Sequence, residues 1–170
     1  ARIGGSRLFK SSSAAFKDVG KLDEAIQTQE KAICIKPDYE EALSNLGVVL
    51  HKNGNFSQAI EAYKKALKLK PENPKTYNNL AAVQRSQGKL TDAEFAYRQA
   101  LKIDPYYADA HNHLGVILKE QGKPAEAIEA YNKALSLKPD SSDTYYNLGV
   151  AYQELGKKDK AIDAYKKVLM

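Results

Sequence analysis

Asparagine side chains recur along this chain at a regular spacing, and their chemistry suits the recognition of a polypeptide. A carboxamide offers both hydrogen-bond donors and an acceptor. A row of carboxamides can therefore pair with the backbone of an extended peptide, largely independently of the peptide's side chains. The row has a period of 34 residues and consists of Asn45, Asn79, His113 and Asn147, and one residue earlier lie Ser44, Asn78, Asn112 and Tyr146.

A second set of positions with the same spacing is mostly basic. It consists of Lys17, His51, Arg85, Lys119 and finally Gln153. Such a column could favour an acidic ligand through a focused field. Cations near helix C-termini are also favourable by themselves, by a few tenths of a kcal/mol each. We favour this second, structural explanation and keep the acidic ligand as the alternative.

Residues for catalysis or metal binding are not arranged in any recognised motif. There is no P-loop, no nucleotide-binding or hydrolase glycine motif, and no zinc-binding His–Glu or Cys pattern. His111 and His113 are two residues apart on a predicted helix, so they point in different directions and cannot share a metal. The single cysteine, Cys34, excludes a disulfide within the chain. We therefore expect no enzyme activity, no cofactor and no metal.

Composition limits the classes of partner. The net charge of +5 comes from 26 basic against 21 acidic residues that are spread through the chain, which indicates solubility rather than a nucleic-acid footprint. No apolar run is long enough to span a membrane, and the N-terminus lacks the apolar stretch of a secretory leader. We expect a protein or peptide partner, no nucleic acid and no membrane, and a cytoplasmic location is favoured.

The elements that position these residues follow from an internal repeat. Pro37, Pro71, Pro105 and Pro139 each close a similar segment, such as KALKLKP, and successive prolines are 34 residues apart. A fixed period of this length predicts a stack of similar units rather than one compact domain.

Each unit is predicted to be a pair of short helices. In residues 40–73 an apolar stripe at helical spacing begins at Leu43 and ends at Leu50. Gly54 then marks a helix end, because glycine readily takes the left-handed conformation. A second stripe runs from Phe56 to Leu67, and Pro71 ends the unit. The small residue at position 47, repeated at 81, 115 and 149, lets the partner helix come close.

The residue types that recur in each unit resemble the pattern of the tetratricopeptide repeat (TPR), in about five repeats. The second repeat carries it as Leu43, Leu46, Gly47, Leu50, Gly54, Ala59, Tyr63, Ala66 and Pro71. The resemblance implies an all-α, right-handed superhelical solenoid of antiparallel helix pairs. It divides the chain into an N-terminal tail (1–5), a degenerate first repeat (6–39), and repeats at 40–73, 74–107, 108–141 and 142–170, the last truncated in its second helix.

Both ends depart from the TPR pattern. In the first repeat Ser12 and Ser13 replace a Leu–Gly pair and Gln29 replaces a tyrosine, so we expect a weak or displaced first helix and a second helix at about 22–36. Because the chain stops inside a helix, we expect an excised piece of a longer protein. Its last helix is predicted to expose Ala161, Ile162, Tyr165, Val168 and Leu169.

The resemblance places ligands in a concave groove lined by the first helices, and we expect an extended peptide there. The predicted contacts are Asn45, Asn78, Asn79, Asn112, His113, Asn147, His51, Arg85 and Lys119. A polar filler role stays open, since asparagine is common at this position in TPR sequences. A carboxylate clamp of the chaperone-binding type is disfavoured, because Ala14 and Asn79 occupy two of its required positions.

Two alternative functions remain. The exposed C-terminal edge, with Tyr165 and Leu169, and an N-terminal arm that does not fold in place would favour self-assembly into a homo-oligomer. Similar asparagine rows hold substrate peptides in O-GlcNAc transferases. The chain is therefore also consistent with the substrate-selecting arm of a larger enzyme of that type.

Overall fold

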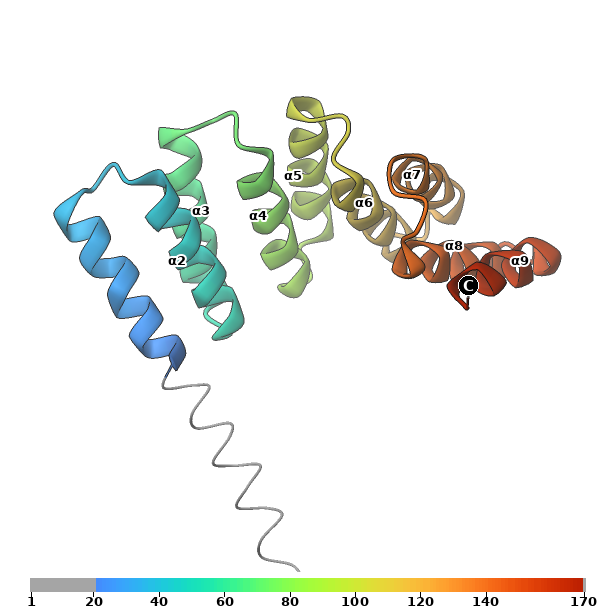
Figure 1. Cartoon of the computed structure of the whole chain (residues 1–170), viewed down its shortest axis with the longest axis horizontal. Helices are drawn as coiled ribbons and strands as arrows, with labels where there is room; N and C mark the ends of the chain where they lie inside the picture. The colour runs from blue at the N-terminus through green and yellow to red at the C-terminus, as the bar shows by residue number, and fades with distance from the viewer. Residues whose placement is uncertain (1–20, 170) are drawn as a thin grey trace, which may run out of the picture. The chain divides into compact units, whose positions relative to one another are not determined.

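The computed structural model describes residues 21–169, and every regular element in that range is an α-helix (Figure 1). The all-α prediction is therefore confirmed. Residues 21–35 form a helix, close to the predicted range of 22–36. The prediction of a weak or displaced helix before it falls on residues 1–20 and lies outside the described residues. Between residues 21 and 169, no helix is both long enough and apolar enough to cross a membrane.

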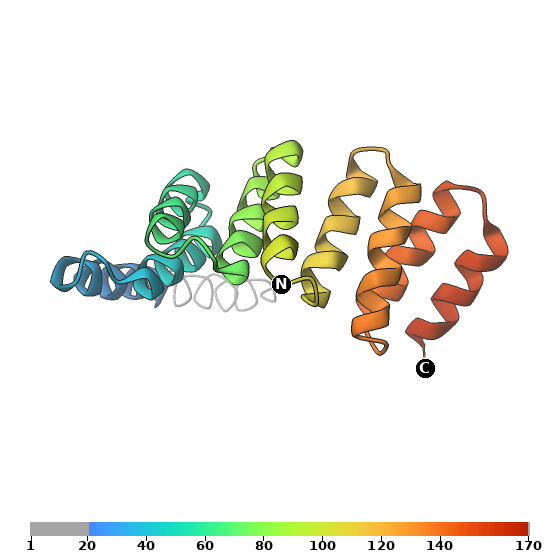
Figure 2. The same ribbon diagram turned by 90° about the horizontal axis from the view of Figure 1, so that it is seen from above.

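The chain divides into two compact units, one that ends at Pro71 and one that begins at Glu72. In unit 1 the helix of residues 21–35 lies beside α2 (Glu40–Lys52), which pairs with α3 (Phe56–Leu69). Unit 2 consists of α4 (Pro74–Ser86), α5 (Leu90–Ile103), α6 (Ala108–Glu120), α7 (Pro124–Leu137), α8 (Ser142–Glu154) and α9 (Lys158–Val168). Each helix of unit 2 follows its predecessor in space as well as in sequence, from green to red in Figure 2.

Local sequence signals account for the helix ends. Gly54, Gly88, Gly122 and Gly156 have φ of 78°, 74°, 76° and 69°, the left-handed conformation that the period of glycines predicted. At the other ends, the Asn73 and Ser141 side chains accept hydrogen bonds from the backbone N–H groups of Thr76 and Thr144. Pro74 and Pro124 occupy first-turn positions, where the missing N–H costs little.

Within each pair, a tyrosine of the second helix packs against a small residue of the first. A Cβ atom on Gly47 or Gly115 would lie 2.7 or 2.5 Å from a ring carbon of Tyr63 or Tyr131, closer than carbon atoms can approach, and one on Gly149 would overlap the Tyr165 ring in the same way. Tyr131 is fully buried in this contact. The predicted close approach of the two helices is confirmed. It determines which face of each helix is buried within the pair and which face is left for other contacts.

The prediction for α9 was partly wrong. Ala161 is buried, with 4% of its surface exposed, because it packs at the position of Ala59, Ala93 and Ala127 in the earlier repeats. Ile162 and Leu169 are exposed, as predicted. Tyr165 is half-buried, and its ring contacts Tyr146 with a centroid distance of 5.9 Å.

Candidate functional site

The first helices of unit 2 carry a row of amide and imidazole side chains that includes two hydrogen-bonded pairs. His113 Nδ1 on α6 lies 3.1 Å from Asn78 Oδ1 on α4. Asn147 Nδ2 on α8 donates to Asn112 Oδ1 on α6 over 3.2 Å. Both bonds join residues 35 apart in sequence, so each links a first helix to the first helix of the next repeat. The structure thus brings four of the sequence-predicted residues together on one face of unit 2.

The members of this row differ in how much they offer a ligand. Asn78 is buried, with 7% of its surface exposed, and its carbonyl oxygen lies against His113. Asn79, Asn112, His113 and Asn147 are half-buried, so each presents part of its side chain to solvent. Asn45, on α2 of unit 1, is exposed. Asn78 is therefore placed to orient the His113 imidazole rather than to contact a ligand, whereas the side chains of the other residues are accessible to a ligand.

The two cations of the basic column in unit 2, Arg85 and Lys119, are already paired with acids of the next repeat. Arg85 Nε lies 3.0 and 3.1 Å from the two carboxylate oxygens of Glu120, and Lys119 Nζ lies 3.9 Å from Glu154 Oε1. The hydrogen bond to Glu120 raises the pKa of Arg85. These pairs also join residues 35 apart. The positive charge of the predicted basic column is therefore largely compensated in unit 2.

The two ends of the basic column have different surroundings. His51, on α2 of unit 1, is half-buried beside the Phe56 ring at 5.7 Å, and burial lowers the pKa of its imidazole. Gln153, on α8, accepts a hydrogen bond from the Tyr165 hydroxyl over 3.2 Å. Tyr165 thus helps to hold the last pair of helices together, whereas Leu169, which is 88% exposed, has no such role.

His113 gives this face a measurable pH dependence. Burial lowers the pKa of its imidazole, while Asp109 acts in the opposite direction and Arg85 in the same one. Its pKa in the folded chain lies below the value near 6.5 of an unfolded chain, so the unfolded state takes up the proton first. Stability contributed by neutral His113 is present above about pH 6.5 and is lost as the pH falls below it.

We expect His113→Asn to remove this part of the pH dependence. Asparagine occupies the same position in three of the other repeats and can donate to Asn78. The free energy of unfolding, measured by urea titration at about pH 7.5 and about pH 5.5, should fall less in the variant than in the wild type. An equal fall in both proteins would show that His113 does not titrate differently on folding.

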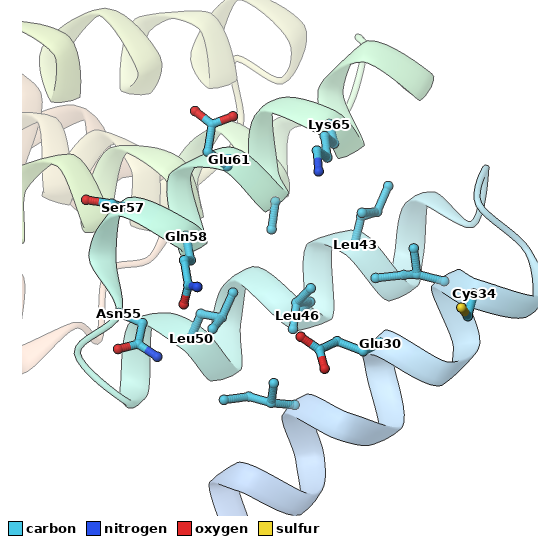
Figure 3. A pocket seen from close by; sticks show the side chains of 13 residues that line it. Glu30, Cys34, Leu43, Leu46, Leu50, Asn55, Ser57, Gln58, Glu61 and Lys65 are labelled. Carbon is cyan, nitrogen blue, oxygen red and sulfur yellow. The ribbon is translucent and has the colours of Figure 1, made fainter.

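A second candidate site is an apolar groove within unit 1, which we call the unit 1 groove (Figure 3). It encloses about 540 Å³ between the helix of residues 21–35 and α3, with α2 as its floor. Apolar side chains line its length. Glu30 and Glu61 come from opposite walls, with the Glu61 carboxylate directed away from Glu30 in Figure 3, and Cys34 and Lys65 lie toward one end. The apolar lining consists of Ile26, Ile33, Leu43, Leu46, Leu50 and Ala62.

No metal site accompanies these features in the described range of residues 21–169. No group of three or more His, Cys, Asp or Glu side chains there could hold an ion. His111 Nε2 lies 2.9 Å from the Pro105 carbonyl oxygen, whereas His113 contacts Asn78. The two imidazoles thus have separate partners. Cys34 is an exposed free thiol.

Sequence reasoning missed the acidic partners and the unit 1 groove. Glu120 and Glu154 lie 35 residues after Arg85 and Lys119, and this offset of one repeat plus one residue was a usable signal. The same offset joins the amides. No comparable signal marks the groove, because its apolar residues belong to the same stripes that form the core elsewhere.

Comparisons with known proteins agree with the repeat architecture. A family model described as TPR repeat matches residues 15–54 and 116–156, and models described as tetratricopeptide repeat match residues 38–105, 96–129 and 144–169. None of these models describes a catalytic family. A comparison with curated protein sequences finds no match.

Solved structures with the same fold cover nearly the whole chain. A crystal structure of MamA has 31% identity and a TM-score of 0.82, and the match covers 90% of each chain. YrrB, whose structure is described as a TPR protein with an unusual peptide-binding site, has 22% identity and a TM-score of 0.73 over 92% of this chain and 80% of its own. PilF of Pseudomonas aeruginosa has 22% identity and a TM-score of 0.81 over 94% and 72%. The chain belongs to the tetratricopeptide repeat family.

Proposed function

We propose that this chain is a protein-interaction scaffold and that the face formed by α4, α6 and α8 binds an extended peptide. The observation that carries the proposal is the amide row, in which two pairs of side chains are hydrogen-bonded from one first helix to the first helix of the next repeat. The hydrogen bonds orient the row before a ligand arrives, and preorganisation lowers the entropic cost of binding. Asn45 and His51 are proposed to contact ligand within unit 1.

The row retains hydrogen-bonding capacity for a peptide backbone. Asn147 uses an amino hydrogen on Asn112, so its carbonyl oxygen is left to accept, and the Asn112 amino group is left to donate. Asn79 adds a half-buried carboxamide on α4. A strip of half-buried apolar residues one turn further along the helices can receive ligand side chains, and it consists of Ala82, Val116 and Val150.

The ion pairs of Arg85 and Lys119 limit how much an acidic ligand can gain from these two cations. Arg85 and Lys119 are proposed to favour acidic neighbours in the peptide, but each now holds a glutamate. An acidic ligand must therefore replace Glu120 or Glu154, which cancels most of the electrostatic gain. Backbone recognition by the amides carries the affinity in this proposal. The description of the YrrB structure as having a peptide-binding site supports peptide recognition by this fold.

The test uses peptides selected from a random display library on the wild-type chain. We expect Asn79→Ala/Asn147→Ala to weaken their binding by about tenfold or more, because each lost hydrogen bond contributes about 0.5–1.5 kcal/mol. Asn132→Ala is the matched control, since Asn132 is exposed on the second helix α7. Isothermal calorimetry would measure the affinities. Equal affinities for the wild type and the double variant would reject the proposal.

Self-association through α9 is the second candidate, and the exposure of Ile162 (51%) and Leu169 (88%) favours it. Tyr165 is a poor test residue, because its ring packs on Gly149 and its hydroxyl donates to Gln153. If this edge associates, Ile162→Glu/Leu169→Glu should lower the mass measured by sedimentation equilibrium. A wild-type monomer at every concentration tested would reject this candidate.

A further inference from the structure

The unit 1 groove has a counterpart 68 residues later in unit 2, and the two differ in their walls. The second groove lies between α5, α6 and α7, and its α5 wall carries Arg98 and Lys102 where unit 1 has Glu30 and Cys34. In its floor Leu114 is only 6% exposed, whereas the equivalent Leu46 is half-buried. The unit 1 groove therefore offers more apolar surface, and the two grooves differ in charge on one wall: Glu30 lies on the helix of residues 21–35, whereas α5 carries cations.

Among the described residues, the two carboxylates of this groove have at most one weak ionic partner. Glu61 lies 3.9 Å from Lys64 on its own helix, and both side chains are mostly exposed, so the pair contributes little. Glu30 forms no ion pair among the described residues. The groove thus suits an apolar side chain that is flanked by cations.

We propose that the unit 1 groove binds the chain's own segment Arg7–Leu8–Phe9–Lys10. This segment has two adjacent apolar side chains between two cations, which matches the apolar floor and the opposed Glu30 and Glu61 walls. Burial of Leu8 and Phe9 supplies the affinity. The cations favour this groove over its counterpart because Glu30 and Cys34 are replaced there by Arg98 and Lys102, whereas the opposite wall carries a glutamate in both grooves, Glu61 and Glu129.

The connection is long enough for the segment to reach the groove of the same chain. Lys10 and Lys21 are eleven Cα-to-Cα steps apart (21 − 10), a connection that spans up to about 36 Å when extended. Lys21 and Cys34 lie thirteen residues apart on one helix, which corresponds to about 20 Å. Because covalent attachment over so short a connection gives an effective concentration on the order of millimolar, binding within one chain is favoured over exchange between chains.

Cys34 provides a reporter, since it lines the groove and is the only cysteine of the chain. We expect Leu8→Ser/Phe9→Ser to raise the rate at which a bulky thiol reagent labels Cys34 by about tenfold, because the groove then stays open for a larger fraction of the time. Ser12→Ala/Ser13→Ala, which changes the same segment outside the motif, should leave the rate unchanged. Equal labelling rates in all three chains would overturn the proposal.

A disulfide test distinguishes binding within a chain from binding between chains. Ser11→Cys places a thiol directly after an intact motif, and a bond to Cys34 requires that their Cα atoms come within about 7 Å. Under mild oxidation we expect an intramolecular disulfide in a monomer, formed about tenfold faster than in the same chain with Leu8→Ser/Phe9→Ser. A covalent dimer would overturn the proposal, because the occupant would then be a second copy.

The charge pairing has its own control. In the Ser11→Cys chain, Glu30→Lys/Glu61→Lys should slow disulfide formation, because the groove then repels the cations of the segment. Adding Arg7→Glu/Lys10→Glu should restore the rate, because the charges of the groove and of the segment are then both reversed and attract each other again. Rates that do not respond to the first change would remove Glu30 and Glu61 from the site and overturn the proposal. None of these residues belongs to the amide row, so the outcome is independent of peptide binding by unit 2.

Discussion

Tyr131→Ala should lower the stability of unit 2 by about 3–5 kcal/mol, the usual loss when a fully buried aromatic side chain is removed. Tyr131 has no exposed surface and fills the contact between α6 and α7 against Gly115. The loss combines the transfer free energy of the ring with the cavity left behind, since two paired helices cannot collapse fully into that space.

Tyr131→Phe is the matched control for this prediction. The Tyr131 hydroxyl is buried and has no hydrogen-bond partner among the described residues, and burial raises the pKa of this phenol. Removing an unsatisfied hydroxyl leaves the ring contacts intact and should be neutral or stabilising, by up to about 1–3 kcal/mol. A large loss in Tyr131→Phe would show that the hydroxyl makes an interaction essential to the fold.

Amide hydrogen exchange is the appropriate measurement for Tyr131→Ala. Repeat proteins unfold repeat by repeat, so a single global free energy can hide a local change. The loss of protection should be largest in α6 and α7, because these helices share the altered contact. Uniformly unchanged protection in both helices would contradict the prediction.

Gly115→Val should be the second most damaging single change, with a loss of about 3 kcal/mol or more, the upper end of overpacking effects. A Cβ atom at this position would lie 2.5 Å from Tyr131 Cε1, and a buried aromatic ring between two helices has little room to move. The helices must separate, which also weakens the neighbouring contacts of Leu114 and Leu118.

The third repeat shows how far such a change can be accommodated. Ala81 occupies the equivalent position in α4, and both it and Tyr97 are buried. A methyl group is therefore tolerated where the pair has adapted to it. Gly115→Ala should accordingly cost less than Gly115→Val, about 1–3 kcal/mol. The graded series Gly, Ala, Val can be measured by urea unfolding of the three chains.

A double-mutant cycle isolates the contact from the general cost of valine in a helix. Tyr131→Leu shortens the opposing side chain, so Gly115→Val should cost less in that background. Glu129→Val, at an exposed position of α7, measures the intrinsic helix preference alone. If Gly115→Val costs no more than Glu129→Val, the close approach of the helices does not limit this position.

The sequence by itself determined the repeat and the ends of its helices. Period-34 glycines predicted the left-handed turns at Gly54, Gly88, Gly122 and Gly156, because few other residues adopt that conformation cheaply. Stripes at helical spacing likewise predicted the buried faces. These features depend on residues close in the chain, so local chemistry is sufficient to define them.

The side-chain pairs between repeats were decided only by the tertiary structure. The sequence predicted Arg85 and Lys119 as a basic column, yet each faces a glutamate 35 residues further on. The amides were predicted as a row open to ligand, yet Asn78 is buried beneath His113. Whether such groups are free or paired depends on how one repeat stacks on the next.

The unit 1 groove likewise depends on how neighbouring helices pack and not on the sequence pattern alone. Leu46 and Leu114 occupy equivalent positions in equivalent stripes, so periodicity treats them alike, yet only Leu114 is buried. The difference arises from the distance between neighbouring helices and from the side chains that line the walls. A stripe of apolar residues specifies which side of a helix faces inward, but only the packing of three helices decides whether that side is filled.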